Sequence, residues 1–276
     1  MTPDTRMTPD RYVTFRTLHE SGCFVMPNPW DPGTARVLAQ LGFPALATTS
    51  SGSAWSLGHH DNHISLSQSL AHLRAIAGSV EVPVNADFEG GFAVRPEDVA
   101  AHVAQAVETG VAGLSIEDST GDQSDPLFEF QLSVERVGAA RAAIDRTGVG
   151  VLLTGRSEGF IVGRPDLKET IRRLTAYAEA GAECLYAPGL STVEDITAVV
   201  NAVAPRPVNV LARPSLTVGD LARAGVRRIS VGGAFARTAW TAFLDAAHEA
   251  AERGTFTAIG RAIPGAEMNG LFRQTR

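Results

Sequence analysis

The chain has 276 residues, and its 24 basic and 30 acidic side chains give it a formal net charge of -6. This mild acidity, with no run of basic residues among aromatic ones, argues against a nucleic-acid partner. The apolar stretches are far shorter than the ~20 residues that cross a bilayer, so we expect no membrane partner. No signal-peptide pattern opens the chain, and we expect a cytoplasmic protein.

The first residues repeat Met-Thr-Pro-Asp, and we interpret residues 1–10 as a loose N-terminal tail. The two cysteines, Cys23 and Cys184, stand at predicted strand starts, where we expect buried free thiols in a reducing compartment. Residues 255–276 have too little pattern for an independent unit, so we expect a C-terminal arm that packs on another subunit.

Eight short apolar segments alternate with helical patterns, which indicates a parallel sheet covered by helices. The predicted strands cover residues 24–29, 45–50, 82–88, 113–118, 151–156, 184–188, 208–212 and 228–233. Glycine follows several of the intervening helices, as at Gly181, because the residue after a helix favours the left-handed conformation. Proline introduces two strands, at Pro83 and Pro207, and we expect Pro96 and Pro165 in first helical turns.

Eight such units in a chain of this length predict a (β/α)8 barrel, with residues 1–276 forming one domain. An open doubly wound sheet is the alternative. It is less favoured because no Gly-x-Gly-x-x-Gly follows the first predicted strand.

Acidic residues gather at the ends of successive predicted strands and in the loop after the second. Asp87 and Glu89 close one strand, two residues apart and so expected on the same side, Glu117 closes the next, and Asp61 lies in that loop. Their repulsion calls for a positive group between them, and a hard divalent cation suits oxygen ligands. We therefore predict a Mg²⁺ site, with Mn²⁺ as a substitute, in which Asp87 is the direct ligand and the other three act through water. Each acid alone is equally consistent with a solvated loop or a helix cap.

Arg156 ends the fifth predicted strand, and its planar guanidinium is able to donate two parallel hydrogen bonds to a substrate carboxylate. The alternative is a salt bridge to Glu158 or to another acid at the barrel mouth. Ser50, Ser51 and Gly52 end the second strand in small polar residues that are able to cradle an oxyanion, although such runs are also ordinary turns.

Two further residues are candidates for substrate binding. Trp30 follows the first strand and either walls the pocket or packs in the core. Asn209 is polar within an apolar strand and is either a ligand or a satisfied core amide. His59, His60 and His63 lie close to Asp61, but their neighbours are oxygen donors, which disfavours a zinc site.

These motifs together resemble the isocitrate lyase/phosphoenolpyruvate mutase superfamily, from about residue 24 to residue 254. The resemblance rests on Asp-Phe-Glu at 87–89, Ile-Glu-Asp at 116–118, Ser-Leu-Gly…Asp at 56–61, Gly-Ala-Glu-Cys…Pro-Gly at 181–189 and Ile-Ser-Val-Gly-Gly at 229–233. It implies a (β/α)8 barrel, Mg²⁺ held largely through water, 2-oxo-acid or enol-pyruvate substrates, and a homotetramer that exchanges its last helix between paired subunits. It also implies metal-site roles for Asp61, Asp87, Glu89 and Glu117, substrate-carboxylate binding by Arg156, and oxo-acid binding by residues 50–52.

The loop at 119–127 departs from that family. It reads Ser-Thr-Gly-Asp-Gln-Ser-Asp-Pro-Leu, without the cysteine, lysine or histidine of the typical lyases and without the lysine and asparagine of the phosphonomutases. Its glycine, serine and proline are typical of a flexible polar lid. A typical isocitrate or methylisocitrate lyase, and a typical phosphonomutase, are therefore disfavoured.

Three hypotheses of function follow. The first is a Mg²⁺-dependent carbon–carbon lyase of a small 2-oxo-acid, most simply an oxaloacetate-like decarboxylase, or a retro-aldol enzyme, working through an enolate, with Asp61, Arg156, Ser50 and Glu117 as catalytic residues. The second is a phosphorus–carbon mutase or hydrolase acting on phosphonopyruvate. The third is a 2-oxo-acid binding protein with little catalysis.

Overall fold

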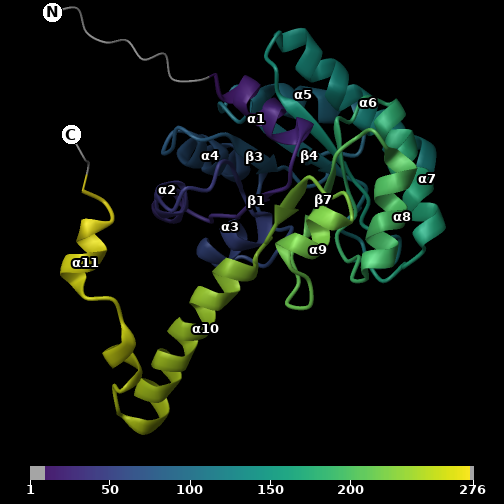
Figure 1. Cartoon of the computed structure of the whole chain (residues 1–276). Helices are drawn as coiled ribbons and strands as arrows, with labels where there is room; N and C mark the ends of the chain where they lie inside the picture. Colours follow the sequence, from purple (N-terminus) through teal and green to yellow (C-terminus); the bar gives the residue numbers. More distant parts are fainter. Residues whose placement is uncertain (1–9, 274–276) are drawn as a thin grey trace, which may run out of the picture.

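The computed structural model describes residues 10–273 and shows a barrel of parallel strands surrounded by helices (Figure 1). The strands are β1 (Phe24–Met26), β2 (Leu46–Ala47), β3 (Val84–Asp87), β4 (Gly113–Glu117), β5 (Leu152–Arg156), β6 (Cys184–Tyr186), β7 (Val208–Leu211) and β8 (Arg228–Ser230). They form one parallel sheet in the order β1-β8-β7-β6-β5-β4-β3-β2. The backbone N–H of Ala47 donates to the Pro27 carbonyl at 3.0 Å and joins β2 to the end of β1. The predicted (β/α)8 barrel is confirmed.

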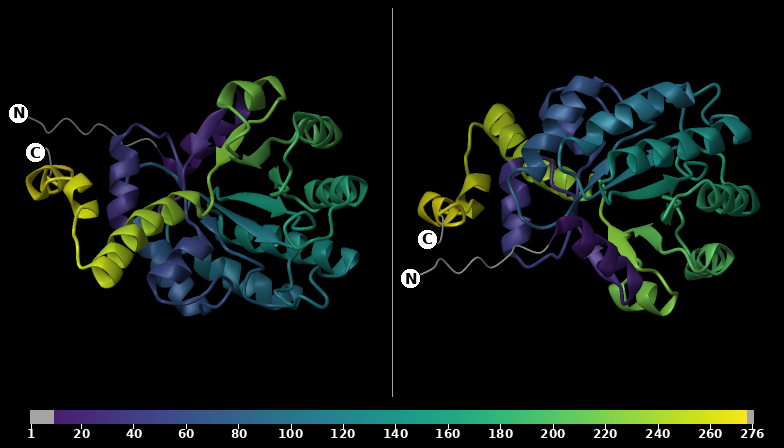
Figure 2. Two further views of the ribbon diagram at one scale, coloured as in Figure 1. Left: turned by 90° about the horizontal axis from the view of Figure 1, so that it is seen from below. Right: turned by 90° about the horizontal axis from the view of Figure 1, so that it is seen from above.

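Helices follow every strand and cover the outside of the barrel (Figure 2). They are α1 (Arg11–Glu20), α2 (Pro32–Gln40), α3 (Ser50–Ser56), α4 (Leu66–Ala77), α5 (Pro96–Val107), α6 (Phe130–Thr147), α7 (Leu167–Glu179), α8 (Val193–Val203), α9 (Val218–Arg223), α10 (Ala234–His248) and α11 (Gly265–Gly270). A π-helical turn, η1 (Glu249–Arg253), and a 3-10 turn, η2 (Ala258–Arg261), lie between α10 and α11.

Local sequence signals explain most element ends. Gly181 has φ of +104° just after α7, as expected for a glycine that closes a helix. Pro96 is the first residue of α5, as predicted. The prediction for Pro165 was wrong, because Asp166 caps α7 by accepting a hydrogen bond from the Glu169 N–H at 3.0 Å, so the helix begins at Leu167.

Helix α1 closes the amino-terminal end of the barrel. Its Phe15 is fully buried beside Gly113 of β4, where an added Cβ would lie 2.5 Å from the Phe15 ring. Cys184 is buried as predicted, but Cys23 is only partly buried, because it lies in the turn that precedes β1 rather than in the strand. Both are free thiols.

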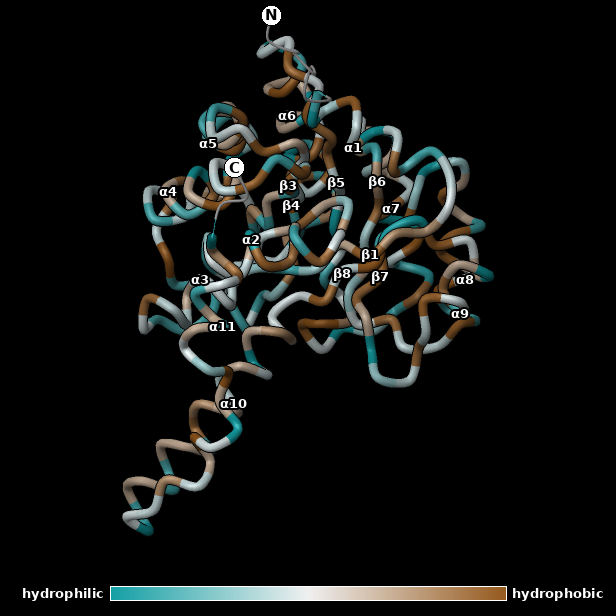
Figure 3. The backbone as a smooth tube through the Cα atoms, turned by 60° about the vertical axis from the view of Figure 1, so that its left-hand side comes forward, coloured by the Kyte–Doolittle hydropathy of each residue, from teal (hydrophilic) through white to brown (hydrophobic). Residues whose placement is uncertain are grey.

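Helix α10 projects away from the barrel, and the chain then turns back to α11 (Figures 1 and 2). Only Ala236 of α10 is buried, and the helix exposes large apolar side chains: Phe235, Trp240, Phe243 and Leu244. Apolar and polar residues are mixed along the projecting segment (Figure 3). The arm ends beside α2, where the Gln40 side chain donates to the Leu271 carbonyl at 2.9 Å.

Residues 1–9 of the predicted tail and residues 274–276 of the predicted arm lie outside the described residues. Asp10, the last residue of the predicted tail, caps α1 through the Tyr12 N–H at 2.8 Å. Within residues 10–273, no helix combines the length and the apolar character that crossing a membrane requires.

Candidate active site

A cavity of about 240 Å³ opens at the carboxyl ends of the strands, where barrel enzymes place their active sites. Its wall includes six of the residues that the sequence singled out: Ser50, Ser51, Asp61, Asp87, Arg156 and Asn209. The structure thus gathers residues from β3, β5, β7, α3 and the loop after α3 into one site.

Asp87 is the centre of the hydrogen bonding in this cavity. Its Oδ2 accepts from both the backbone N–H and the hydroxyl of Ser50, each at 3.0 Å. Its own N–H donates to the Thr48 hydroxyl at 2.9 Å. Residues 48–50 do not prolong β2 as predicted, because Thr49 caps α3 and Ser50 is the first helical residue. That turn directs the Ser50 donors at Asp87.

Arg156 supplies the positive charge among these carboxylates. Its Nη1 lies 3.1 Å from Asp87 Oδ1 and 3.2 Å from Glu117 Oε2, and its Nε donates to Glu158. The salt-bridge alternative therefore describes its position in the structure. The three carboxylates raise the pKa of Arg156 well above its usual value, although burial alone would lower it. Burial raises the pKa of Glu117 and Glu158, and Arg156 opposes that shift.

Glu89 does not lie where strand alternation would place it. Strand β3 ends at Asp87, and Glu89 has φ of +48°, so the strand alternation on which the same-side prediction rests does not extend to Glu89. Glu89 and Glu117 line an adjoining cavity of about 300 Å³ instead. Burial, then the charges of Asp87 and Asp61, raise the pKa of Glu89 to about 8. Partial burial and Asp87 also raise the pKa of Asp61.

The donor set fits a hard divalent cation. Asp61, Asp87, Glu89 and the Ser50 hydroxyl offer only oxygen, and Glu89 Oε1 is buried without a hydrogen-bond partner in residues 10–273. In the same range, no three His, Cys, Asp or Glu side chains lie close enough to share a metal directly. A cation held here would therefore use one or two carboxylates and complete its shell with water.

Two predicted substrate-binding residues do not line the cavity. Trp30 lines a separate hollow together with Trp240 and Phe243 of α10. Gly52 is buried inside α3, where an added Cβ would lie 2.6 Å from the Thr49 side chain. The roles predicted for both residues are corrected accordingly.

Asn209 reaches the cavity wall, but its amide is satisfied. It donates to the Ser230 hydroxyl at 2.9 Å and accepts from Arg228 Nε at 2.9 Å. The core-amide interpretation therefore describes it better than the ligand interpretation.

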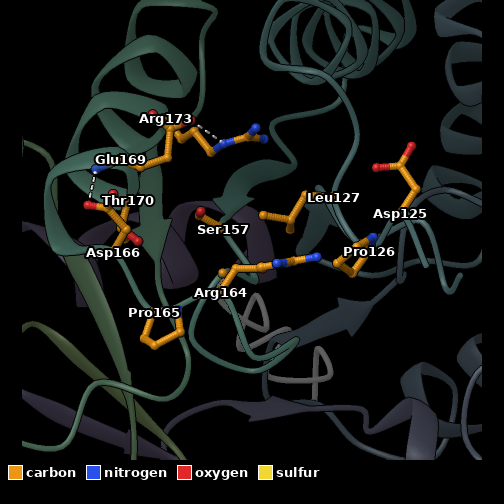
Figure 4. Close-up of a pocket in the computed structure, with 11 residues that line it drawn as sticks. Asp125, Pro126, Leu127, Ser157, Arg164, Pro165, Asp166, Glu169, Thr170 and Arg173 are labelled. Atoms are coloured by element: carbon orange, nitrogen blue, oxygen red, sulfur yellow. Dashed lines mark hydrogen bonds and ion pairs between the residues drawn. The ribbon is translucent and has the colours of Figure 1, made fainter. Parts of the chain in front are cut away.

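The loop at 119–127 stands beside the site and forms a turn of its own. Thr120 bonds the Asp125 carbonyl at 2.5 Å, and Asp122 accepts from the Ser124 N–H at 2.8 Å. A third cavity, of about 570 Å³, separates this loop from the segment after β5, and Arg164 extends across it towards Pro126 (Figure 4). The segment after β5, which contains Arg164, is therefore the neighbour of the loop that was predicted to form a lid.

Sequence reasoning missed two arginines of the cavity wall, Arg228 and Arg237, and it gave Asp118 no role, whereas Glu158 is the salt-bridge partner of Arg156 that it offered as an alternative. Asp118 accepts from the Glu158 N–H at 2.7 Å and from Tyr177 at 2.6 Å, which ties β4 to β5 and α7. Arg228 and Arg237 line the cavity from β8 and α10. An arginine at the start of the eighth strand, next to the apolar Ile229, was the available signal for Arg228, whereas the position of Arg237 depends on the direction of α10.

The family model described as phosphoenolpyruvate phosphomutase matches residues 15–251. Three relatives illustrate the likeness. A crystal structure from Burkholderia cenocepacia J2315, whose activity is given only provisionally as lyase or mutase, is 45% identical, with a TM-score of 0.92 and 97% of each chain covered. An oxaloacetate decarboxylase from Pseudomonas entomophila is 30% identical over 82% of this chain and 79% of the relative. The structure of a phosphonopyruvate hydrolase with oxalate and Mg²⁺ is 26% identical, with a TM-score of 0.82 and 94% and 95% of the chains covered.

Proposed function

The chain belongs to the phosphoenolpyruvate phosphomutase family, within the isocitrate lyase/phosphoenolpyruvate mutase superfamily, and from this membership and its site we propose that it is a Mg²⁺-dependent carbon–carbon lyase of small 2-oxo-acids. The observation that carries the proposal is the convergence of Ser50, Asp61 and Arg156 on Asp87 in one cavity. Members of this superfamily are lyases and mutases, which supports an enzyme rather than a binding protein.

The protein side chains have separate tasks in this proposal. Asp87 would hold Mg²⁺ directly, with Asp61, Glu89 and Glu117 acting through water. Bound Mg²⁺ would act as a Lewis acid for the 2-oxo group and its neighbouring carboxylate. The Ser50 and Ser51 hydroxyls orient the oxo-acid. Arg156 keeps the carboxylates of the site in place. Its Nη2 makes no hydrogen bond within residues 10–273.

Decarboxylation of an oxaloacetate-like acid is the simplest reaction for these residues. Breaking the bond to the departing carboxylate leaves a pyruvate enolate, and water is a sufficient proton donor for it. No cysteine, lysine or histidine is therefore needed in the loop at 119–127, and none is present. The similarity to oxaloacetate decarboxylase supports this choice. The same loop contains no basic residue, which disfavours phosphorus–carbon chemistry, although a phosphonopyruvate hydrolase is among the structural relatives.

The projecting helix supports an oligomer as part of the proposal. Helix α10 leaves Trp240, Phe243 and Leu244 exposed at the edge of the barrel, and a second copy of the chain would bury them. We propose the homotetramer with exchanged C-terminal helices that the family resemblance implies. Size-exclusion chromatography with light scattering tests this, and a monomer at micromolar concentration would contradict it.

The reaction is tested by following a panel of 2-oxo-acids and phosphonopyruvate by NMR, with Mg²⁺ and with EDTA. We expect Mg²⁺-dependent conversion of oxaloacetate or a substituted analogue to the corresponding pyruvate, faster than with the free metal. The Asp87→Ala variant should lose it, whereas Asp145→Asn, which breaks a surface ion pair with Arg141 at the far end of α6, should keep it. Unchanged turnover in Asp87→Ala would rule out the mechanism.

A further inference from the structure

Three arginines line the cavity, and two of them come from the β8–α10 unit. Arg156 lies on β5 among the acids, whereas Arg228 lies on β8 and Arg237 on the first turn of α10. Strand β8 is separated from β3, which carries Asp87, by β1 and β2. The cavity therefore has an acidic side and a basic side.

The charge of Arg156 is already engaged by protein groups. Its Nε bonds Glu158, and its Nη1 lies within 3.2 Å of both Asp87 and Glu117. One guanidinium that faces three carboxylates leaves little positive potential for a doubly charged substrate. A second anionic group on a substrate would need another cation.

Arg228 is a buried cation without an acidic partner in residues 10–273. It is 2% exposed, and its three hydrogen bonds go to the neutral acceptors Asn209 Oδ1, Thr154 Oγ1 and His19 Nε2, at 2.9, 3.0 and 3.2 Å. Burial and the nearby Arg228 lower the pKa of His19 to about 3, so this imidazole is neutral. A buried charge of this kind is costly unless an opposite charge approaches it. Arg228 therefore makes the floor of the cavity attractive to anions.

Arg237 lies at the mouth of the cavity, on the same basic side as Arg228. Its backbone N–H donates to the Gly233 carbonyl at 2.9 Å, but its exposed side chain makes no hydrogen bond or ion pair within residues 10–273. We propose that Arg237 binds a second, distal carboxylate of the substrate, with Arg228 reinforcing the positive potential from below. This inference rests on the proposed function and narrows its substrates to 2-oxo-dicarboxylic acids.

The size and polarity of the cavity support that orientation. A volume of about 240 Å³ suits a small acid rather than a cofactor-sized ligand. Asp61 and Asp87 repel a distal carboxylate from their own side, while the two arginines attract it to the opposite one. The bidentate fork of an arginine is also the side chain best matched to a carboxylate.

The experiment compares ligands that differ only in the distal group. Oxaloacetate is paired with 2-oxobutyrate, and 2-oxoglutarate with 2-oxovalerate, so that a carboxylate replaces a methyl group on a chain of equal length. Affinities are measured with Mg²⁺ by calorimetry, with competition for turned-over ligands, in the wild type, Arg237→Gln, Arg237→Lys and the control Arg206→Gln. Arg206 is exposed just before β7, at the opposite end of the barrel. Circular dichroism and thermal melting verify that each variant is folded.

We expect the wild type to prefer the dicarboxylate of each pair by roughly 10- to 100-fold, as one charge-assisted hydrogen-bond pair allows. Arg237→Gln should remove that preference, Arg237→Lys should keep part of it, and Arg206→Gln should keep all of it. Oxalate has no distal group, so its affinity should be equal in the wild type and in Arg237→Gln. If folded Arg237→Gln retains the preference while oxalate binds normally, the inference is wrong and the proposed function stands. If no 2-oxo-acid and no oxalate binds the wild type with Mg²⁺, both fail.

Discussion

Replacing Tyr177 by phenylalanine should destabilise the protein by removing one buried hydroxyl. That hydroxyl donates to Asp118 Oδ2 at 2.6 Å, and both residues are almost completely buried. Hydrogen bonds to a charged group contribute about 1.5–3 kcal/mol. In Tyr177→Phe, Asp118 would still accept hydrogen bonds from Arg173 at 3.2 Å and from the Glu158 N–H at 2.7 Å. The expected loss of stability therefore lies at the lower end of that range, at about 1.5–2 kcal/mol.

Urea denaturation at a fixed protein concentration measures this loss. In thermal denaturation, a shift of about 2–4 °C per kcal/mol predicts that the melting temperature falls by about 3–8 °C. Tyr12→Phe is the matched control, because the Tyr12 hydroxyl has no hydrogen-bond partner within residues 10–273 and the same atom is removed. That variant should stay within about 0.5 kcal/mol of the wild type. A Tyr177→Phe loss no larger than the control's would refute the reasoning that Asp118 depends on this bond.

Three further results are expected. The pKa of Glu89 is raised to about 8 in the folded state, so protonation of this carboxyl favours folding. In EDTA, the free energy of unfolding should therefore fall as the pH rises from 5 to 8, by at most about 1.4 kcal/mol per pH unit from this group. Urea titrations of Glu89→Gln should show a flatter pH dependence. Gly113→Ala should cost about 1–3 kcal/mol of stability by calorimetry, since its Cβ would meet the Phe15 ring, and an unchanged melting temperature would show that α1 yields freely. A double change of Trp240 and Phe243 to glutamate should dissociate the proposed oligomer in light scattering, and an unchanged mass would exclude α10 from the interface.

The barrel was predictable because its signals are local. Glycine closes helices through a backbone conformation that needs no tertiary partner, as at Gly181, and apolar strands of uniform length indicate a covered parallel sheet. Strand ends were less predictable. The polar residues after Ala47 read as an extension of β2, but Thr49 caps a helix, and a cap depends on the path that the following residues take.

The sequence by itself determined that acids gather at one end of the barrel, because the carboxyl ends of parallel strands share an edge. Only the tertiary structure decided which acids face the same cavity. Glu89 leaves β3 through a positive φ and turns to the adjoining hollow, while Asp87 stays with Ser50.

The partners of each charge also depended on the tertiary structure. Arg156 carries the charge that a substrate carboxylate requires, but its neighbours on β3, β4 and the segment after β5 give it three protein carboxylates. Arg237 reaches the cavity only because α10 starts at its rim before leaving the barrel. Residue type and periodicity fix what a side chain is able to bind, whereas the interactions it makes depend on distances between segments far apart in the chain.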